Sequence, residues 1–107
     1  MMYSVSLLFH TSPVDEPNSH QSWEDRILLI LADDEDQAKF KAEEEARKHE
    51  FVYESAAGRM LTVKLACVER VFLIDSELTN GCELFSRFLR DSEARSLLEP
   101  FADDEAS

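Results

Sequence analysis

Apolar and polar residues alternate along the start of the chain. The odd-numbered residues from Tyr3 to Phe9 are all apolar, and Ser4 and Ser6 lie between them. A period of two is typical of a half-buried strand, because successive side chains point to opposite faces of a sheet. The next stretch, residues 11–22, contains two prolines and no periodicity, so we expect a long surface loop there.

The segment RILLILA is apolar on both faces of an extended strand. Ile27, Leu29 and Leu31 share one face, and Leu28 and Ile30 share the other. A strand of this composition is either covered on both sides or exposes an adhesive surface. We therefore expect a second strand here, and both of its faces need cover.

The acid-rich segment that follows predicts one long helix. Asp34 can cap its first turn, with Gln37 three residues later as in a capping box, and the acidic start suits the helix dipole. Alanines recur at every fourth position from Ala38 to Ala46, a stripe of small residues that lets a helix approach a sheet closely. Phe40 lies on the other side of this helix and is either exposed or covered by another segment, such as LLEPF near the C-terminus.

Three further strands are expected after the helix. The segments FVYE and MLTVKLACVERVFLI flank a turn in which Gly58 can supply a positive φ. The pair Asn80-Gly81 is a strong signal for a two-residue hairpin. This hairpin would return the chain as a fifth strand, CELFSRFL, with Thr79 opposite Cys82.

These elements predict an α+β domain. Its antiparallel sheet has about five strands, in the order β-β-α-β-β-β, and carries one long helix on one face. Residues 1–90 form this single domain, and residues 91–107 form an acidic C-terminal tail with a short helix around Leu97 and Leu98. One helix covers one face only, so either the sheet curls, or the tail covers the second face, or two copies pair. We expect a homodimer.

The charge of the chain narrows the range of partners. It has 23 acidic and 11 basic residues, a net charge of −12. Binding to phosphate backbones needs clustered lysine and arginine, so we expect neither nucleic acid nor an anionic membrane surface as a partner. A basic protein suits this charge, although plain solubility is the simpler explanation.

The cysteines and the N-terminus indicate a cytoplasmic protein. Cys67 and Cys82 lack the C-x-x-C spacing of redox and zinc sites, and the first residues do not resemble a signal peptide. No apolar run reaches the roughly 20 residues that cross a bilayer. We expect reduced thiols and no membrane association.

No pattern of catalytic or metal-binding residues stands out. Cys82 has no histidine near it in the sequence, so we expect an inert thiol that packs as a small hydrophobe. The acid run at 33–36 lacks the glycine and the spacing of a calcium loop, and the histidines form no zinc motif. Two distant glycines cannot form a phosphate-binding loop. We expect no enzymatic activity, no metal and no cofactor.

Two charges in the last predicted strand lack an obvious partner. Glu83 and Arg87 lie four residues apart, about 13 Å on a strand, which is too far for an ion pair between them. A charge on an apolar face is costly unless it is paired. We favour ion pairs at the sheet edge over a ligand or partner site, and both interpretations stay open. The candidate partners are Arg70, Glu69, Glu24 and Arg26.

Several short motifs together carry a family resemblance. They are Tyr3-Ser4-Val5, Trp23-Glu24, the acidic helix start leading to Ala38, Tyr53-Glu54 with Gly58, and Gly81-x-Glu83-x-x-Ser86-Arg87-Phe88. Over roughly residues 3–89 the chain resembles the small bacterial domain-of-unknown-function family 4288. It departs from the family pattern at Ser55, where an asparagine is expected, and in its acidic tail. The resemblance implies a bacterial cytoplasmic origin and a shared structural or binding role for Glu83, Ser86 and Arg87.

Our leading hypothesis for the function is an acidic, non-enzymatic protein-binding module. It would neutralise a basic partner through the carboxylates of the helix and the loop. The alternative is a small-ligand-binding or enzymatic domain with a sheet-edge pocket around Glu83 and Arg87. The candidate binding residues are Trp23, Glu24, Glu83, Ser86 and Arg87. For Trp23 a core position is the interpretation that we favour over a contact residue.

Overall fold

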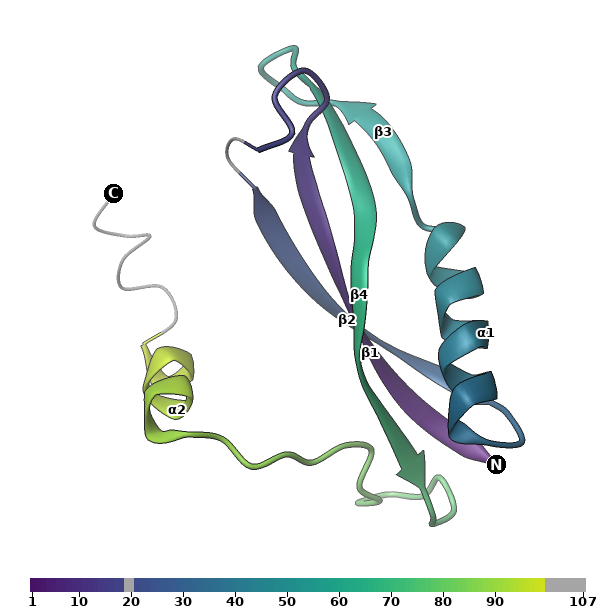
Figure 1. The fold of residues 1–107 in the computed structure, drawn as a ribbon. Helices are drawn as coiled ribbons and strands as arrows, with labels where there is room; N and C mark the ends of the chain where they lie inside the picture. Colours follow the sequence, from purple (N-terminus) through teal and green to yellow (C-terminus); the bar gives the residue numbers. More distant parts are fainter. Residues whose placement is uncertain (19–20, 100–107) are drawn as a thin grey trace.

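The computed structural model describes residues 1–18 and 21–99, and it shows a four-stranded antiparallel sheet with one long helix against it (Figure 1). In chain order the elements are β1 (Met2–Pro13), β2 (Ser22–Leu31), α1 (Glu35–Arg47), β3 (Phe51–Glu54), β4 (Met60–Ile74) and α2 (Asp91–Leu98). The strands lie in the order β2-β1-β4-β3. The predicted α+β class with a helix on one face is confirmed, and the prediction of five strands is wrong.

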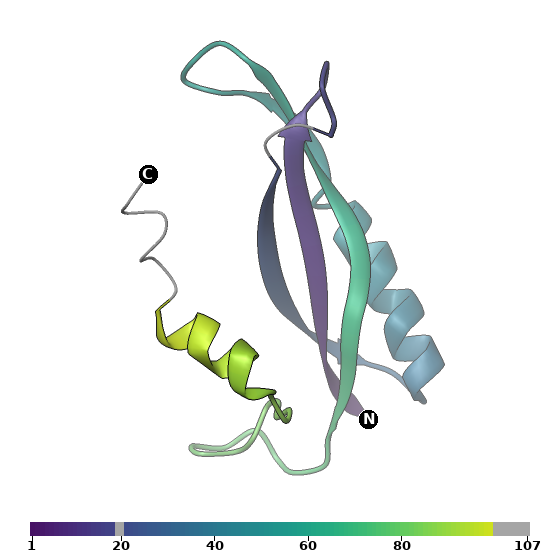
Figure 2. The ribbon, with the colours of Figure 1, turned by 60° about the vertical axis from the view of Figure 1, so that its left-hand side comes forward.

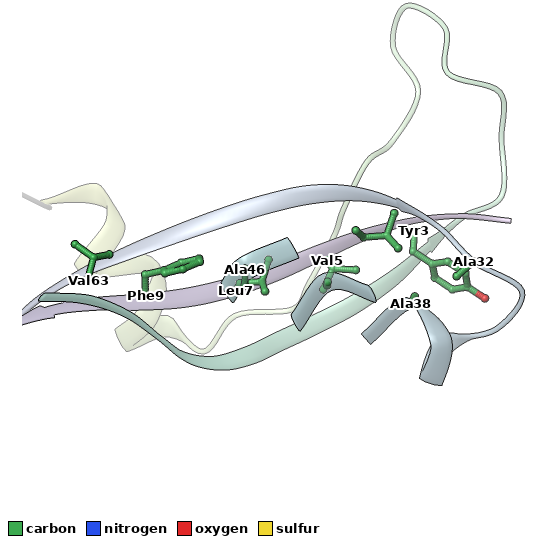
Figure 3. Close-up of a cluster of buried hydrophobic side chains, with 10 residues drawn as sticks. Tyr3, Val5, Leu7, Phe9, Ala32, Ala38, Ala46 and Val63 are labelled. Atoms are coloured by element: carbon green, nitrogen blue, oxygen red, sulfur yellow. The ribbon is translucent and has the colours of Figure 1, made fainter. Parts of the chain in front are cut away.

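The core lies between α1 and one face of the central strand β1. Figure 3 shows Tyr3, Val5, Leu7 and Phe9 in a row along this face, and all four are buried. The predicted alanine stripe, Ala38, Ala42 and Ala46, is completely buried against them. A helix can approach a sheet this closely only where its contact face carries small side chains, so the alanines set the distance between the two layers.

Helix α1 begins as the sequence predicted. The backbone N–H of Gln37 donates to Oδ1 of Asp34 over 2.8 Å, and the Gln37 side chain accepts from the N–H of Asp33 over 2.7 Å. These two bonds satisfy backbone donors near a helix start, where no intrahelical partner exists. Phe40, on the outer side of α1, is exposed, and α2 lies on the opposite side of the sheet (Figure 2). Pro100 and Phe101 of the LLEPF segment lie outside the described residues.

The first strand is longer than predicted. β1 continues to Pro13, pairing with Leu61 of β4, and β2 begins at Ser22 opposite Thr11. The predicted loop of residues 11–22 therefore shrinks, because its first and last residues join the sheet. A proline is tolerated at Pro13 because the pairing with β2 ends at Thr11, so this end of β1 is an edge on that side.

The predicted fifth strand does not form. Asn80 and Gly81 do make a turn, in which the N–H of Cys82 donates to the carbonyl of Thr79 over 3.1 Å and Gly81 has a φ of 88°. However, β4 has already ended at Ile74, and the segment after the turn pairs with no described strand. Its first residues instead touch the sheet through side chains, with the Phe85 ring half-buried against Phe72, while Leu84, Phe88 and Leu89 stay exposed.

We call residues 82–98 the arm. In Figures 1 and 2 the arm leaves the lower end of the sheet and carries α2 on the side opposite to α1. Within the described chain, α2 packs against none of the other helices or strands. The predicted helical turns around Leu97 and Leu98 are present, but the acidic residues at 100–107 lie outside the described residues.

Two irregularities interrupt the pairing of β4 with β1. Ser6 lies opposite Arg70 and Leu7 lies opposite Val68, so Glu69 is an extra residue on β4, and a second shift follows between Leu8 and Phe9. Such bulges bend a strand and re-aim a side chain. No helix among the described residues is long and apolar enough to span a bilayer.

Enlarging the alanine stripe should push the two layers apart. We expect Ala42→Leu to lower the free energy of unfolding by about 1–3 kcal/mol, because the added atoms have no space between α1 and β1. Lys39→Leu is the control, because it makes a helix-compatible change at an exposed position of α1. Urea unfolding followed by circular dichroism measures both variants, and an Ala42→Leu protein as stable as the control would contradict the close packing.

The Tyr3 phenol should make the fold sensitive to alkali. Burial raises its pKa above the ordinary value, and the carboxylates of Asp34 and Glu35 raise it further. A raised pKa in the folded state means that this stabilisation is complete below the unfolded value of about 10 and is lost as the pH rises above it. The measurement is a near-ultraviolet absorbance titration of the wild type and of Tyr3→Phe, whose difference is the signal of the Tyr3 phenol. This signal should appear at a higher pH in the folded chain than in the chain unfolded by urea. Ionisation at the same pH in both would contradict the burial of Tyr3.

Candidate functional site

The face of the sheet opposite α1 is only partly covered. On β2, Trp23, Ile27 and Leu29 are 59%, 56% and 54% exposed. Ile27 and Leu29 lie opposite Ser6 and Ser4 of β1, the two serines that interrupt the apolar pattern of that strand. Exposed apolar side chains that adjoin one another mark interaction surfaces more often than single exposed ones do.

A groove runs between the free edge of β2 and helix α1. It has a volume of about 580 Å³ and is lined by four consecutive strand residues, 28–31, together with Lys41, Glu44, Glu45 and His49 of α1 and the residues after it. Side chains of a strand alternate between faces, so four consecutive residues share a groove only when it follows the strand edge. β2 has no strand on this side in the described part of the chain.

The groove combines an apolar floor with charged walls. Nζ of Lys41 donates to the backbone carbonyl of Leu31 over 2.9 Å, which satisfies one acceptor at the end of β2. Nζ of Lys48 lies 2.8 Å from Oε1 of Glu45, and this hydrogen bond lowers the pKa of Glu45 below its ordinary value. Glu44 forms no hydrogen bond or ion pair with another described residue, although its charge helps to raise the pKa of Lys48.

Arg87 forms an ion pair with Glu69, one of the partners predicted from the sequence. Its Nη1 lies 3.2 Å from Oε1 of Glu69, the extra residue of the β4 bulge, and both side chains are less than one-third exposed. Arg70 lies 3.9 Å from the same carboxylate. Glu83 and Ser86 are exposed and make no polar contact with any other described residue. The ion pair with Glu69 supports a structural role for Arg87. Glu83 has no such ion pair among the described residues.

The start of the arm is held on the sheet by three kinds of contact. The hydroxyl of Ser4 donates to the carbonyl of Leu84. The Phe85 ring meets the edge of the Phe72 ring at 5.7 Å between centroids, and the Arg70 guanidinium lies 5.7 Å from the Phe85 centroid. These contacts, with the Arg87 ion pair, fix residues 84–87 and leave the rest of the arm free of the sheet.

Trp23 and Glu24 lie on opposite faces of β2. The Trp23 ring packs at 5.5 Å on the His10 ring, and its exposure makes the favoured core position wrong. Glu24 faces the helix side opposite Phe9, where it pairs with Arg26, and the Arg26 guanidinium lies 4.5 Å from the Phe9 centroid. The five predicted binding residues are thus not brought into one site.

Glu24 lines a pocket that is separate from the groove at the edge of β2. This pocket, of about 280 Å³, includes Phe51 and Tyr53 of β3, whose rings pack at 5.5 Å. Its only acidic side chain is already paired with Arg26. Elsewhere, no group of three or more potential metal ligands converges among the residues that the structure describes, and both cysteines are free, Cys67 exposed and Cys82 half-buried.

The groove residues of α1 were missed by sequence reasoning. From the sequence alone, the polar side of the predicted helix shows no feature that marks a site. The groove residues on this side are Lys41, Glu44, Glu45 and His49. The signal that could have found them was RILLILA, because a strand that is apolar on both faces needs cover on both sides, and one helix leaves apolar surface beside it.

The fold defines a small α+β protein in which a curled four-stranded antiparallel sheet carries one long helix. The sequence model of a family described as a domain of unknown function, DUF4288, matches residues 2–86, and the chain belongs to that family. No curated protein and no solved structure shows significant similarity to the chain. The matched range ends at Ser86, so Phe88 and α2 lie beyond it.

Removing the Phe85 ring should release the arm. We expect Phe85→Ala to lower the free energy of unfolding by about 1–2 kcal/mol, a part of the cost for a fully buried phenylalanine, because this ring is half-buried. Phe88→Ala at low protein concentration is the control, since the Phe88 side chain is fully exposed among the described residues, and it should change stability by less than about 0.5 kcal/mol. Equal stabilities of the two variants in urea unfolding would show that the arm is not packed on the sheet.

Proposed function

We propose that the chain is a non-enzymatic protein-binding module that accepts an extended, basic segment of a partner protein along the edge of β2. The observation that carries this proposal is the groove between β2 and α1, which combines a free strand edge, an apolar floor and carboxylates on the helix wall.

The free edge offers hydrogen bonds that do not depend on the partner's sequence. In strand addition, main-chain bonds supply affinity, and alternate side chains of the incoming strand supply specificity. Residues 28–31 of β2 line the groove, and this length, about 13 Å, matches a segment of four residues. Lys41 occupies the carbonyl of Leu31, so an incoming strand either stops before this residue or displaces the ammonium group.

The charge of the chain favours basic segments. Glu44 and Glu45 stand on the wall of the groove, and the net charge of −12 attracts a basic partner over longer distances. Basic side chains that alternate with apolar ones along a strand would meet the carboxylates and the apolar floor in turn.

The groove supports binding better than catalysis. Its lining has no hydroxyl or thiol group, the Lys41 ammonium is bonded to the carbonyl of Leu31, and Glu45 is paired with Lys48. The alternative site around Glu83 and Arg87 receives less support, because the Arg87 guanidinium is taken up by Glu69. A cytoplasmic, bacterial setting belongs to the same proposal, and the free state of both cysteines is consistent with it.

A pair of charge-matched peptides tests the proposal. The probes are fluorescein-labelled peptides of alternating lysine and valine, or of alternating glutamate and valine, with binding followed by fluorescence anisotropy. The lysine peptide should bind, and its affinity should fall as salt is added because ionic screening weakens the carboxylate contacts. Absence of binding by the lysine peptide, or equal binding of both peptides, would refute the proposal.

Matched charge variants locate the site. Glu44→Gln combined with Glu45→Gln removes two charges from the groove wall, and Glu77→Gln combined with Glu83→Gln removes two exposed charges elsewhere. The groove variant should raise the Kd of the lysine peptide roughly fivefold, since exposed ion pairs contribute about 0.2–1 kcal/mol each. Equal weakening by both double variants would mean that net charge alone attracts the peptide.

A further inference from the structure

A second apolar pocket lies at the base of the arm, on the face of the sheet opposite α1. It has a volume of about 230 Å³ and is lined by Ser4, Ile27, Leu28, Leu29, Ile74, Leu78 and Leu84. Apart from the Ser4 hydroxyl, which is bonded to Leu84, every lining side chain is aliphatic. An apolar cavity of about 150 Å³ accepts a benzene ring, so this pocket has room for one aromatic side chain.

The arm presents one aromatic side chain that is fully exposed in the described part of the chain. Phe88 is 104% exposed, whereas Phe85, three residues earlier, is packed on the sheet. Phe88 does not line the pocket of its own chain, and the backbone before it is held by the bond from Ser4 to the Leu84 carbonyl and by the ion pair of Arg87 with Glu69.

We propose that two copies of this chain form a dimer with antiparallel arms, and that Phe88 of each copy fills the pocket lined by Ile27, Leu29 and Leu84 of the other. In a two-fold arrangement centred on Ser86, Phe88 of one arm lies opposite Leu84 of the other. Both pockets are then filled by one symmetry operation, which is the property of an isologous interface. A different protein would have to supply both the ring for the pocket and a cover for the arm.

The exposed apolar area fits a stable dimer. Eight exposed or half-exposed side chains line the pocket or follow it along the arm: Ile27, Leu29, Leu78, Leu84, Phe88, Leu89, Leu97 and Leu98. Together they expose on the order of 900 Å² per copy, if a fully exposed large side chain contributes about 180 Å². A standard specific interface buries about 800 Å² per partner, whereas the largest apolar patch on a typical monomer is about 300–600 Å².

The charge distribution also favours contact between two arms. Residues 82–98 contain three arginines and three carboxylates, so the arm is formally neutral although the chain carries −12. Two copies that meet through their arms therefore avoid most of the repulsion between their acidic surfaces. The pocket lies on the open face and the groove follows the edge of β2, and the two share Leu28 and Leu29 as lining residues. The dimer proposal does not rest on the proposed peptide binding.

Sedimentation velocity of the full chain at increasing protein concentration tests the dimer. We expect a reversible monomer–dimer equilibrium in the wild type and at least a 100-fold higher Kd for Phe88→Ala, because each dimer loses two rings. Phe40→Ala removes another exposed phenylalanine, on the outer side of α1, and should change the Kd less than threefold. Circular dichroism checks that both variants keep the fold. A wild type that stays monomeric, or equal dimerisation of both variants, overturns the proposal.

Crosslinking tests the position of the two-fold axis. In a Cys67→Ser background, which removes the exposed native thiol, Ser86→Cys should form a disulfide-linked dimer under mild oxidation. Ser92→Cys, six residues further along the arm and away from the axis, should crosslink at least tenfold more slowly. Equal or faster crosslinking of Ser92→Cys would exclude the antiparallel arrangement, even if the protein is dimeric.

Discussion

The structure depends on one constraint, which is that the edge strand β2 is apolar on both faces while one long helix, among the described residues, packs on one side of the sheet. β1 and β2 supply apolar side chains to the α1 face, and β2 supplies Ile27 and Leu29 to the other face as well. On the first face, the alanine stripe of α1 packs closely on the sheet and buries its apolar side chains. The second face receives only the start of the arm, and the apolar pocket at the base of the arm arises from this incomplete cover.

The β4 bulge connects the sheet to the arm. A regular ladder would place consecutive side chains of β4 on alternate faces, but the extra residue Glu69 breaks this alternation beside Arg70. Glu69 then pairs with Arg87, and Arg70 approaches the ring of Phe85. The irregular point of the sheet is thus where the arm is anchored, and the arm beyond it extends from the sheet with its apolar side chains exposed.

Local patterns in the sequence predicted the elements whose neighbours are local. The alternation from Tyr3 to Phe9, the cap at Asp34 and the alanine stripe each depend on residues close in the chain, and all are confirmed. The prediction of a fifth strand was wrong, because Asn80-Gly81 specifies a turn but does not specify whether the segment after the turn pairs with the sheet. The choice between a sheet edge and an apolar face depends on which distant surfaces remain uncovered, and no short pattern records this. The same reason explains why Glu69 could be named as one of several partners for Arg87 but not selected.

Two different surfaces follow from the way in which charge and apolar area are separated. The groove at the edge of β2 joins its apolar floor to carboxylates, so it suits a molecule of opposite charge. The pocket under the arm is aliphatic, and the arm beside it is neutral, so it suits a surface like itself. An acidic chain can associate with its own copies only through a region where the charges balance, because repulsion opposes contact elsewhere. Placing three of its eleven basic residues on the arm balances the charge of this region, whereas the groove keeps its carboxylates; the two surfaces meet at Leu28 and Leu29, which line both.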